Sequence, residues 1–385
     1  MVSPARLWLT GMPRDSHIRV VHFPRDPAPY QPPLLAALDR IGVEGRYWLT
    51  PTHSATLNLA IAPLQLLHHW ARGTRILHVH WIYPFRLSWA NKSVARRILR
   101  YCFYLWLLMA RGLNMRIVWT AHNLLPHEPI FDNDKMSRWF LIKQSSAIIA
   151  HDEYTAEQLK AGFNAHSVTV ISQGSISLPT VHAASARAAL GWSEPDALVI
   201  AAIGRIVSYK GFENLLSGVK IAVGRCDELA SHLRVLVTGE CESDELRTTL
   251  TRLTRDLTEA GVQVILRFRQ LSWQELAAAH AAADVIILPY LRVTNSAALV
   301  TALSYGIPVI ASDLPSIRDV GAEAVMRIPP GPESVADSIL AFARMTAEER
   351  KQRSQLGLDW AQGASWDRVA VATKLVYEDA LRSER

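Results

Sequence analysis

Residues 204–211 combine two glycines, two cations and a predicted helix start, and this combination suits the binding of phosphate. An apolar run at 198–203 ends at Gly204-Arg205, and a short polar turn then leads to Lys210-Gly211 and an amphipathic helix. Free backbone N–H groups at a helix N-terminus attract anions, and two nearby cations strengthen that attraction. Turns between strands and helices also carry glycine and surface cations without any ligand, so a purely structural role is the alternative.

A second candidate anion site lies at residues 294–298. Asn295-Ser296-Ala297 precedes an apolar helical stretch, and Thr294 or Asn295 is its predicted N-cap. The free amides of residues 296–298 would then point at an anion, although a capped helix without a ligand is the alternative. Gly239 and Arg269 follow two other predicted strands, so we expect them at the same edge of the sheet.

Ionisable side chains gather at residues 122–128, directly after a predicted strand. They are His122, His127 and Glu128. An imidazole or a carboxylate beside a hydroxyl group can take its proton as a general base. Glu128 is the first choice for that role and His122 the close alternative, whereas the preceding Pro126 favours a turn role for His127.

Aromatic and histidine side chains also follow the predicted strand at 76–80. His80 and Trp81 stand at its end, and Tyr30 lies in a proline-rich loop at 24–33. Such side chains stack on sugar rings at an open site and pack equally well in a core. They are therefore candidate contacts for a second substrate, with burial as the alternative.

Strands and helices alternate along the chain. The predicted strands form two sets of six, at 18–23, 47–49, 76–80, 116–120, 147–150 and 168–171, and then at 197–203, 234–238, 262–268, 285–288, 309–310 and 324–327. This alternation predicts an α/β protein with two doubly wound, Rossmann-like domains that face each other across a cleft. The predicted domains are residues 1–182 and 183–364, followed by a helix at 365–385.

The charge of the chain is uneven. Residues 1–180 carry 19 Lys/Arg against 10 Asp/Glu, and ten cations with no acid lie between Glu44 and Glu128. Arginines flank an aromatic-rich helix predicted near 96–111, which is typical of helices in an anionic membrane interface. A helix packed on a sheet with solvated arginines is the alternative. Nucleic acid is not an expected partner, because the sequence contains no recognised nucleic-acid module.

The cysteines and possible metal ligands indicate the cellular compartment and the cofactor requirement. Three scattered cysteines indicate a reducing cytoplasm, and no run of 18 apolar residues predicts a transmembrane helix. The sequence has no Asp-x-Asp motif and no helical pair of histidines four residues apart with a supporting carboxylate, so we expect neither a metal nor another cofactor. We expect a cytoplasmic protein that associates peripherally with the inner face of the plasma membrane.

Four segments together resemble the bacterial GDP-mannose:glycolipid 4-β-mannosyltransferases of exopolysaccharide assembly of the xanthan type. These segments are 77–81, 117–128, 204–216 and 288–309, and the most specific elements are His-Asn-Leu-Leu-Pro-His-Glu at 122–128 and Asn295-Ser296. The Gly204-Arg205-x4-Lys210-Gly211 spacing is similar to the donor-diphosphate motif of GT-B glycosyltransferases. The resemblance implies the GT-B fold, with a C-terminal helix that crosses back to the first domain.

The resemblance also implies an activity and a role for each candidate residue. The activity is transfer of a hexose, best mannose from GDP-mannose, to a lipid-linked oligosaccharide or glycolipid in polysaccharide biosynthesis. Arg205 and Lys210 would neutralise the leaving diphosphate, and Glu128 or His122 would deprotonate the acceptor. The remaining donor contacts would be Gly204, Gly239, Arg269, Asn295, Ser296 and Ala297, and those of the acceptor or sugar would be Tyr30, His80, Trp81 and His127.

One departure from related families bears on the mechanism. Retaining GT-B enzymes commonly carry two glutamates eight residues apart, and the matching positions here are Val293 and Thr301. Neither side chain accepts two hydroxyl hydrogen bonds as a carboxylate does. The mannosyltransferases that this sequence resembles also lack the pair, so the resemblance implies an inverting mechanism with a β-linked product. The alternatives are a GT-B transferase that uses UDP-glucose or UDP-glucuronate, and a non-catalytic partner protein.

Overall fold

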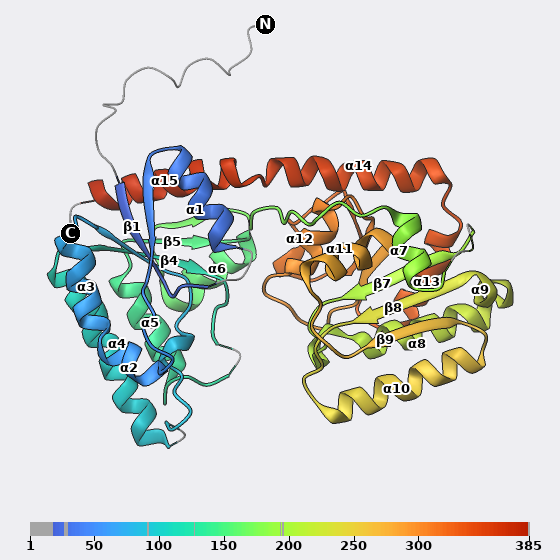
Figure 1. Cartoon of the computed structure of the whole chain (residues 1–385), viewed down its shortest axis with the longest axis horizontal. Coiled ribbons are helices and arrows are strands. Elements are labelled where there is room, and N and C mark those ends of the chain that lie inside the picture. The colour runs from blue at the N-terminus through green and yellow to red at the C-terminus, as the bar shows by residue number, and fades with distance from the viewer. Residues whose placement is uncertain are drawn as a thin grey trace, which may run out of the picture. The chain divides into compact units, whose positions relative to one another are not determined.

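The computed structural model describes residues 18–26, 30–90, 92–126, 128–192, 194 and 196–383, so the predicted contact at His127 lies outside the described residues. The elements are shown in Figure 1. The strands are β1 (Ile18–Phe23), β2 (Val43–Tyr47), β3 (Ile76–Val79), β4 (Arg116–Ala121), β5 (Ala147–Ala150), β6 (Val168–Val170), β7 (Leu198–Ile203), β8 (Leu233–Thr238), β9 (Gln263–Arg267), β10 (Val285–Leu288), β11 (Val309–Ser312) and β12 (Val325–Ile328).

The helices connect these strands. They are α1 (Gln31–Arg40), α2 (Ala55–Ala60), α3 (Ala62–Ala71), α4 (Ser93–Gly112), α5 (Asp134–Gln144), α6 (Glu153–Phe163), α7 (Ala183–Ala189), α8 (Phe212–Arg225), α9 (Asp227–His232), α10 (Asp244–Glu259), α11 (Trp273–Ala282), α12 (Ala297–Ser304), α13 (Pro332–Ala343), α14 (Ala347–Gly363) and α15 (Trp366–Arg382). Among the described residues, no helix is both long enough and apolar enough to cross a bilayer.

The strands form two six-stranded sheets, and their printed pairings are parallel. The orders are β2-β1-β3-β4-β5-β6 and β12-β11-β10-β7-β8-β9. Each sheet therefore reverses its winding direction once, between β1 and β3 in the first and between β7 and β10 in the second. Ligands of doubly wound sheets bind beyond the carboxyl ends of strands at such switch points. This architecture confirms the predicted fold class.

The predicted boundary of the second strand was wrong. The prediction followed the apolar residues at 47–49, but β2 covers Val43–Tyr47 and pairs His22 with Tyr47. Gly42 adopts a φ of +81° directly before the strand, so the chain turns there and becomes extended at once. Trp48 is instead buried after the end of the strand, where its backbone N–H donates to the oxygen of His22.

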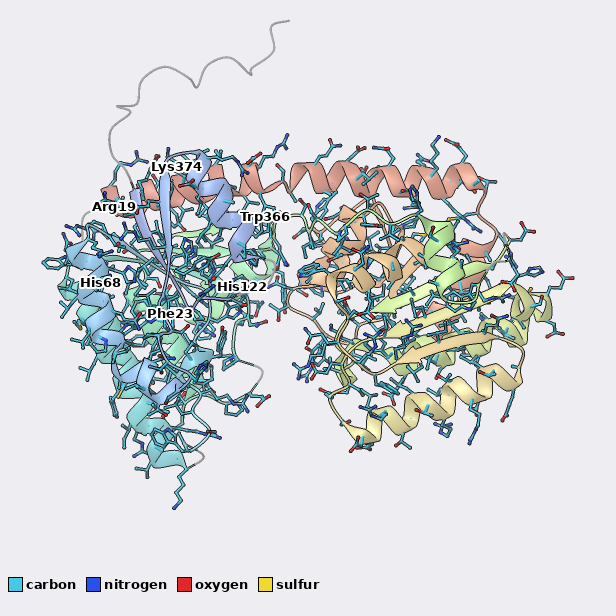
Figure 2. All side chains as sticks on the ribbon, in the orientation of Figure 1. Arg19, Phe23, His68, His122, Trp366 and Lys374 are labelled. Atoms are coloured by element: carbon cyan, nitrogen blue, oxygen red, sulfur yellow. The ribbon has the colours of Figure 1, made fainter. Side chains whose placement is uncertain are left out.

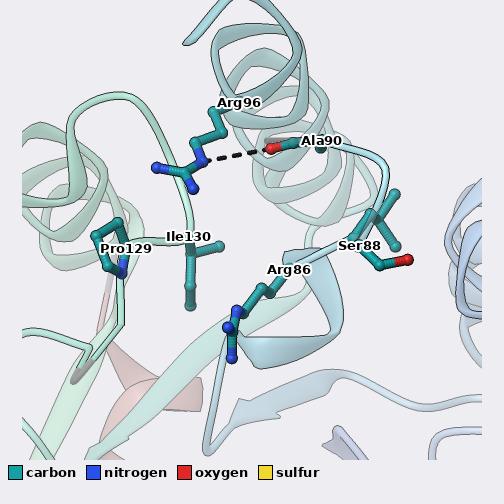
Figure 3. A pocket seen from close by; sticks show the side chains of 7 residues that line it. Arg86, Ser88, Ala90, Arg96, Pro129 and Ile130 are labelled. Carbon is teal, nitrogen blue, oxygen red and sulfur yellow. Dashed lines mark hydrogen bonds between the residues drawn. The ribbon is translucent and has the colours of Figure 1, made fainter. Parts of the chain in front are cut away.

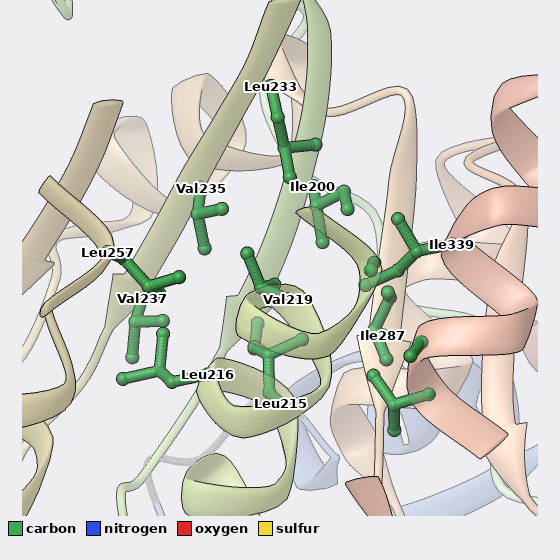
Figure 4. Packing of buried hydrophobic residues seen from close by; sticks show 14 of the residues in the cluster. Ile200, Leu215, Leu216, Val219, Leu233, Val235, Val237, Leu257, Ile287 and Ile339 are labelled. Carbon is green, nitrogen blue, oxygen red and sulfur yellow. The ribbon is translucent and has the colours of Figure 1, made fainter. Parts of the chain in front are cut away.

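The second sheet is buried on both faces, as its continuous apolar strands require. Leu198, Ile200 and Ala202 of β7 belong to a core with α8, α10 and α13, and Figure 4 shows Ile200 near Val219 and Ile339 of that core. The alternate residues of β7 belong to a second core with α11 and α12. This two-sided burial fixes β7 firmly and thereby fixes the loop that starts at Gly204.

The chain divides into two compact units. The first unit contains residues 1–120, 125–148 and 370–385, and the second contains 121–124 and 149–369. Residues 370–382 of α15 thus belong with the first half of the chain. Within that unit the Tyr377 hydroxyl lies 2.6 Å from Nδ1 of His78, and Lys374 donates to the backbone oxygen of Ile41 at 2.9 Å. Figure 2 labels Lys374, Arg19 and Phe23, all of which belong to this unit. The predicted return of the C-terminal helix is confirmed, whereas the boundaries at 182 and 364 stay predictions.

Candidate active site

Three loops of the second unit, which follow β7, β8 and β10, approach one another so closely that their backbone atoms are in contact. A Cβ atom on Gly239 would lie 1.8 Å from the oxygen of Gly204, and one on Gly211 would lie 2.0 Å from the oxygen of Pro289. Gly211 also adopts a φ of +69°, which favours glycine. A Cβ does not fit at Gly211 or Gly239, and Gly204 adopts a φ of +132°, which favours glycine. Gly204, Gly211 and Gly239 thus form one closely packed surface at the switch point, which we call the platform.

Two cations lie on this platform. The ammonium Nζ of Lys210 lies 3.5 Å from the position that a Cβ of Gly204 would occupy, and the next residue after Gly204 is Arg205. Burial, and then the charge of Arg205, lower the pKa of Lys210 from 10.5 to about 8. Among the described residues, no carboxylate forms an ion pair with Lys210 or Arg205. A partly buried ammonium beside a second cation gains most from an anionic ligand.

The loop after β10 is tied to the turn that carries Lys210. Leu291 N–H donates to the oxygen of Tyr209 at 2.9 Å. The buried Tyr290 hydroxyl lies 2.8 Å from Oγ of Ser296, and Ser296 accepts from the amide of Leu299 as the N-cap of α12. The prediction of Thr294 or Asn295 as N-cap was therefore wrong. Because Ser296 is anchored by a buried tyrosine, the helix begins one residue later, at Ala297, the last of the predicted donor contacts.

Asn295 points instead at the segment 121–124, which belongs to the same unit. Its side-chain nitrogen donates to the backbone oxygen of His122, so two predicted site residues are in contact. Nδ1 of His122 lies 3.1 Å from Nε2 of His151, and Nδ1 of His151 lies 3.0 Å from the oxygen of Ile171. The sequence analysis did not single out His151, although its place directly after β5 was a usable signal.

These contacts determine which nitrogen of each histidine ring donates and which accepts. A carbonyl oxygen only accepts, so Nδ1 of His151 carries a proton. Burial lowers the pKa of His151 to about 4, so its ring is neutral at pH 7 and its Nε2 is an acceptor. Nδ1 of His122 must then be the donor to His151. In its neutral form, a His122 ring that donates from Nδ1 carries its basic electron pair on Nε2, which is the form a general base needs.

Glu128 has different surroundings. Its exposed carboxylate forms an ion pair with Arg86 within the first unit. The structure thus pairs Glu128 with Arg86 of its own unit. Its role as a base stays a prediction.

Arg269 is engaged by a neighbouring carboxylate. Its guanidinium lies 3.0 Å from Glu275 in one of two contacts, and Glu275 also accepts from Ser272 in a capping box at the start of α11. Hydrogen bonding from Arg269 lowers the pKa of Glu275 to about 2. The Ser272-x-x-Glu275 spacing was a readable capping signal. Arg269 therefore contacts the capping box at the start of α11, and the role of Arg269 in binding the donor stays a prediction.

The switch point of the first sheet holds a histidine cluster that the sequence analysis did not find. His22, His78 and His80 are buried, and one ring nitrogen of each lies within 4.8 Å of the others. Nδ1 of His22 lies 2.9 Å from Nε2 of His80, and the rings of His78 and His80 stack with centroids 4.1 Å apart. Parallel pairing of β1 with β3 sets His22 directly beside His78, a contact that a search for helical histidine pairs does not detect.

These contacts describe a hydrogen-bonded network rather than three converging lone pairs. Both ring nitrogens of His78 are engaged, by Tyr377 and by Thr120 at 2.7 Å. Tyr30 is buried beside the cluster, with its ring centroid 5.7 Å from that of His80. Burial raises the pKa of Tyr30, and a hydrogen bond with Thr120 opposes that shift. Tyr30 and His80 therefore pack in the first unit, Trp81 is partly buried beside them, and their roles as acceptor contacts stay predictions.

The sequence of the second half matches a known family. Residues 197–344 match the family model described as "Glycosyl transferases group 1". This range contains the platform glycines, Arg205, Lys210 and Ser296. A curated relative, the D-inositol 3-phosphate glycosyltransferase of Streptomyces bingchenggensis, is 30% identical over 258 residues, which cover 64% of this chain and 55% of the relative. The chain thus spans about half the length of the curated relatives it matches.

Solved structures resemble almost the whole chain. Sucrose-phosphate synthase of Thermosynechococcus elongatus superposes with a TM-score of 0.66 at 16% identity, over 94% of this chain and 98% of that one. An Anabaena protein solved in complex with UDP superposes with a TM-score of 0.60 at 12% identity, over 94% and 99% of the two chains. At such identities the likeness concerns the fold, and it confirms the GT-B architecture.

Proposed function

We propose that the protein is a glycosyltransferase that moves a hexose from a nucleoside-diphosphate sugar to a hydroxyl group of a lipid-linked saccharide. The observation that carries the proposal is the partly buried Lys210 ammonium beside Arg205, at the switch point between β7 and β10. The match of residues 197–344 to group 1 glycosyl transferases supports it. The names of the curated relatives support a transferase as well.

In the proposed reaction, positive charge of the protein stabilises the negative charge that develops on the leaving diphosphate. The acceptor oxygen forms a bond to C1 of the hexose while the bond from C1 to the diphosphate breaks, and the electron pair of that bond leaves with the diphosphate. Lys210, Arg205 and the amides at the start of α12 stabilise the leaving group. The proton of the acceptor hydroxyl goes to a general base.

We assign the base to His122 rather than to Glu128. The His151 contact orients the His122 ring and leaves its basic nitrogen at Nε2, and Asn295 holds the backbone of the same residue. The Glu128 carboxylate instead forms an ion pair with Arg86.

The donor we propose is GDP-mannose, because the segments at 77–81, 117–128 and 288–309 resemble GDP-mannose-dependent glycolipid mannosyltransferases. A UDP-sugar is the second candidate, and the observation that favours it is the likeness to the Anabaena protein solved with UDP. We also propose inversion at C1. The position that would carry the second glutamate of retaining relatives is Thr301, and its hydroxyl donates to the oxygen of Ala297 at 2.7 Å, within its own helix.

The test is transfer of radiolabelled hexose from GDP-mannose, UDP-glucose or UDP-glucuronate into extracted bacterial lipids, followed by NMR of the anomeric proton of the product. We expect mannose transfer with a β linkage. We expect His122→Ala to lower kcat about 10²–10⁴-fold. The matched control is His166→Ala, since His166 is an exposed histidine of the same unit.

Each outcome has a clear consequence. An α-linked product overturns inversion, and transfer from a UDP-sugar alone overturns mannose but keeps the transferase. A larger loss for Glu128→Gln than for His122→Ala moves the base to Glu128. Absence of transfer from all three donors, with unchanged polysaccharide in cells that carry Lys210→Ala, supports the non-catalytic alternative.

A further inference from the structure

The ammonium group of Lys210 faces the open part of the platform. Among the described residues outside 203–205, Nζ of Lys210 is the only atom within 4 Å of the position that a Cβ of Gly204 would occupy, at 3.5 Å. At Gly211 and Gly239 backbone oxygens lie much closer to that position, at 2.0 and 1.8 Å. Lys210 is itself partly exposed. A small ligand can therefore reach both the backbone of Gly204 and the nitrogen of Lys210.

Two neighbouring groups attract a phosphate to this space. The charge of Arg205 acts on the ammonium of Lys210, so the two cations lie within electrostatic reach of each other. Gly211 is the N-cap of α8 and has no side chain that could cap the first amides of this helix. The space above Gly204 thus combines two cations with the positive end of a helix.

Arg205 is the charged neighbour that changes the pKa of Lys210. The carboxylate of Glu242, on the loop after β8, accepts instead from the amide of Ser208 at 2.6 Å. With a cation as its effective neighbour, the ammonium loses a proton more readily than an ordinary lysine. The other titratable groups on the turn itself, on the start of α8 and on the loops after β8 and β10 are Tyr209, Glu213, Glu240, Glu242, Tyr290 and Arg292.

A lysine acts as a nucleophile only when its nitrogen is neutral. Burial, and then Arg205, lower the pKa of Lys210 from 10.5 to about 8. Roughly one-tenth of this amine is therefore neutral at pH 7, about 300-fold more than for a lysine with a pKa of 10.5. Because burial is the larger cause, a bound phosphate that offsets the charge of Arg205 removes only part of this effect.

The basic cavity of the first unit offers no comparable nucleophile. Its volume is about 340 Å³, and the described residues that line it include Arg86, Ser88 and Arg96 but no lysine. Figure 3 shows Arg86 and Arg96 around Ile130, with Arg96 donating to the oxygen of Ala90 at 3.3 Å. A guanidinium keeps its proton in proteins, so it binds an anion without attacking it. The platform differs because one of its two cations is an amine.

We propose that Lys210 is a modification site, at which an acyl phosphate transfers its acyl group to Nζ. Arg205 and the amides at the start of α8 hold the phosphate, and the electron pair of Nζ forms a bond to the carbonyl carbon. The bond from that carbon to the phosphate oxygen breaks, and its electron pair leaves with the phosphate. The ammonium gives one proton to water before the attack, and the nitrogen gives a second to the departing phosphate.

Acylation would inactivate the platform. The amide that forms carries no charge, so the site loses one of its two cations. We expect acetylated protein to bind a nucleoside diphosphate at least tenfold more weakly than unmodified protein. Only this consequence rests on the proposed function, because the modification itself requires no more than a site that binds a phosphate group.

The experiment is incubation of the full chain with acetyl phosphate, followed by mass spectrometry of each lysine over time. At pH 7 we expect acetylation of Lys210 at least about tenfold faster than that of Lys220, an exposed lysine paired with Asp256. Inorganic phosphate should slow the reaction at Lys210 and leave that at Lys220 unchanged. The rate at Lys210 should rise about tenfold from pH 7 to pH 9 and level off above that.

A variant tests the phosphate contact separately. Arg205→Met should slow acetylation of Lys210 about fivefold, because it removes both a phosphate contact and the charge that favours the neutral amine. Arg252→Met is the matched control, since Arg252 is an exposed arginine of α10 in the same unit. The comparison of Lys210 with Lys220 within the wild-type chain does not depend on the folding of any variant.

Two results would overturn the acylation proposal. They are equal rates at Lys210 and Lys220, and a rate at Lys210 that inorganic phosphate does not lower. Binding of GDP and UDP is measured in parallel by isothermal titration. If Lys210 shows no preference while the protein binds a nucleoside diphosphate, the acylation proposal falls and the proposed function stands. If Lys210 is acetylated preferentially while no nucleoside diphosphate binds, the acylation proposal stands and the proposed function falls.

Discussion

Binding of a nucleoside diphosphate should depend on pH through Lys210. The structure lowers the pKa of this ammonium to about 8, chiefly by burial and further by Arg205. A bound diphosphate favours the charged form, so binding raises the pKa again and takes up a proton above pH 8. Affinity is therefore greatest below pH 8 and falls as the pH rises through that value.

The size of the effect follows from the fraction of charged lysine. With a pKa of about 8, roughly nine-tenths of Lys210 is charged at pH 7 and one-tenth at pH 9. If only the charged form binds, the dissociation constant is about tenfold larger at pH 9 than at pH 7. The variant Lys210→Arg keeps its charge throughout this range and should show nearly constant affinity. Lys210→Met should lose about 1.5–3 kcal/mol of binding free energy at pH 7.

Isothermal titration with GDP and UDP at pH 7, 8 and 9 checks these values, and buffers of different ionisation enthalpy report the proton uptake. Lys220→Arg is the control, because Lys220 is exposed and paired with Asp256 at 3.0 Å. Constant wild-type affinity between pH 7 and pH 9 refutes the reasoning. The same decline in Lys210→Arg would assign it to another group.

Three further predictions concern the platform, the returning helix and the cofactor requirement. Gly239→Ala should lower the melting temperature strongly and abolish nucleotide binding, since its Cβ would lie 1.8 Å from the oxygen of Gly204. The control Gly224→Ala should leave the melting temperature and nucleotide binding intact, because its Cβ meets nothing within 4 Å. Equal melting temperatures of the two variants would contradict the close approach of Gly239 to Gly204. Tyr377→Phe should reduce the free energy of unfolding by about 1 kcal/mol through loss of the hydrogen bond to His78, as measured by denaturant titration, and an unchanged value would contradict it. Sugar transfer should persist in EDTA, and its loss would indicate a metal requirement.

The sequence predicted the platform because its signals are local. The run that forms β7, the glycines at 204 and 211 and the cations at 205 and 210 lie within 14 consecutive residues. Their geometry follows from one strand, one turn and one helix start. The predicted bounds of β2 were wrong by a few residues. The turn at Gly42 determines where this strand begins, and the apolar run at 47–49 does not.

Contacts between strands that are distant in sequence were harder to predict. The tautomer of His122 depends on its contact with His151, and the tautomer of His151 depends on the backbone oxygen of Ile171 after the next strand. The histidine cluster depends on the register of β1 against β3, which no local pattern gives. The N-cap at Ser296 depends on the buried hydroxyl of Tyr290, six residues earlier.

Nucleotide binding at the platform beyond β7, β8 and β10 is the most direct test of the proposed function. We would measure the melting temperature of the full chain with GDP, UDP, dTDP and ADP, and repeat the measurement with Lys210→Met. A ligand at 100 times its dissociation constant adds roughly 2.7 kcal/mol of stability. We expect stabilisation by GDP that Lys210→Met removes. No stabilisation by any of the four nucleotides, or equal stabilisation of Lys210→Met, would contradict it.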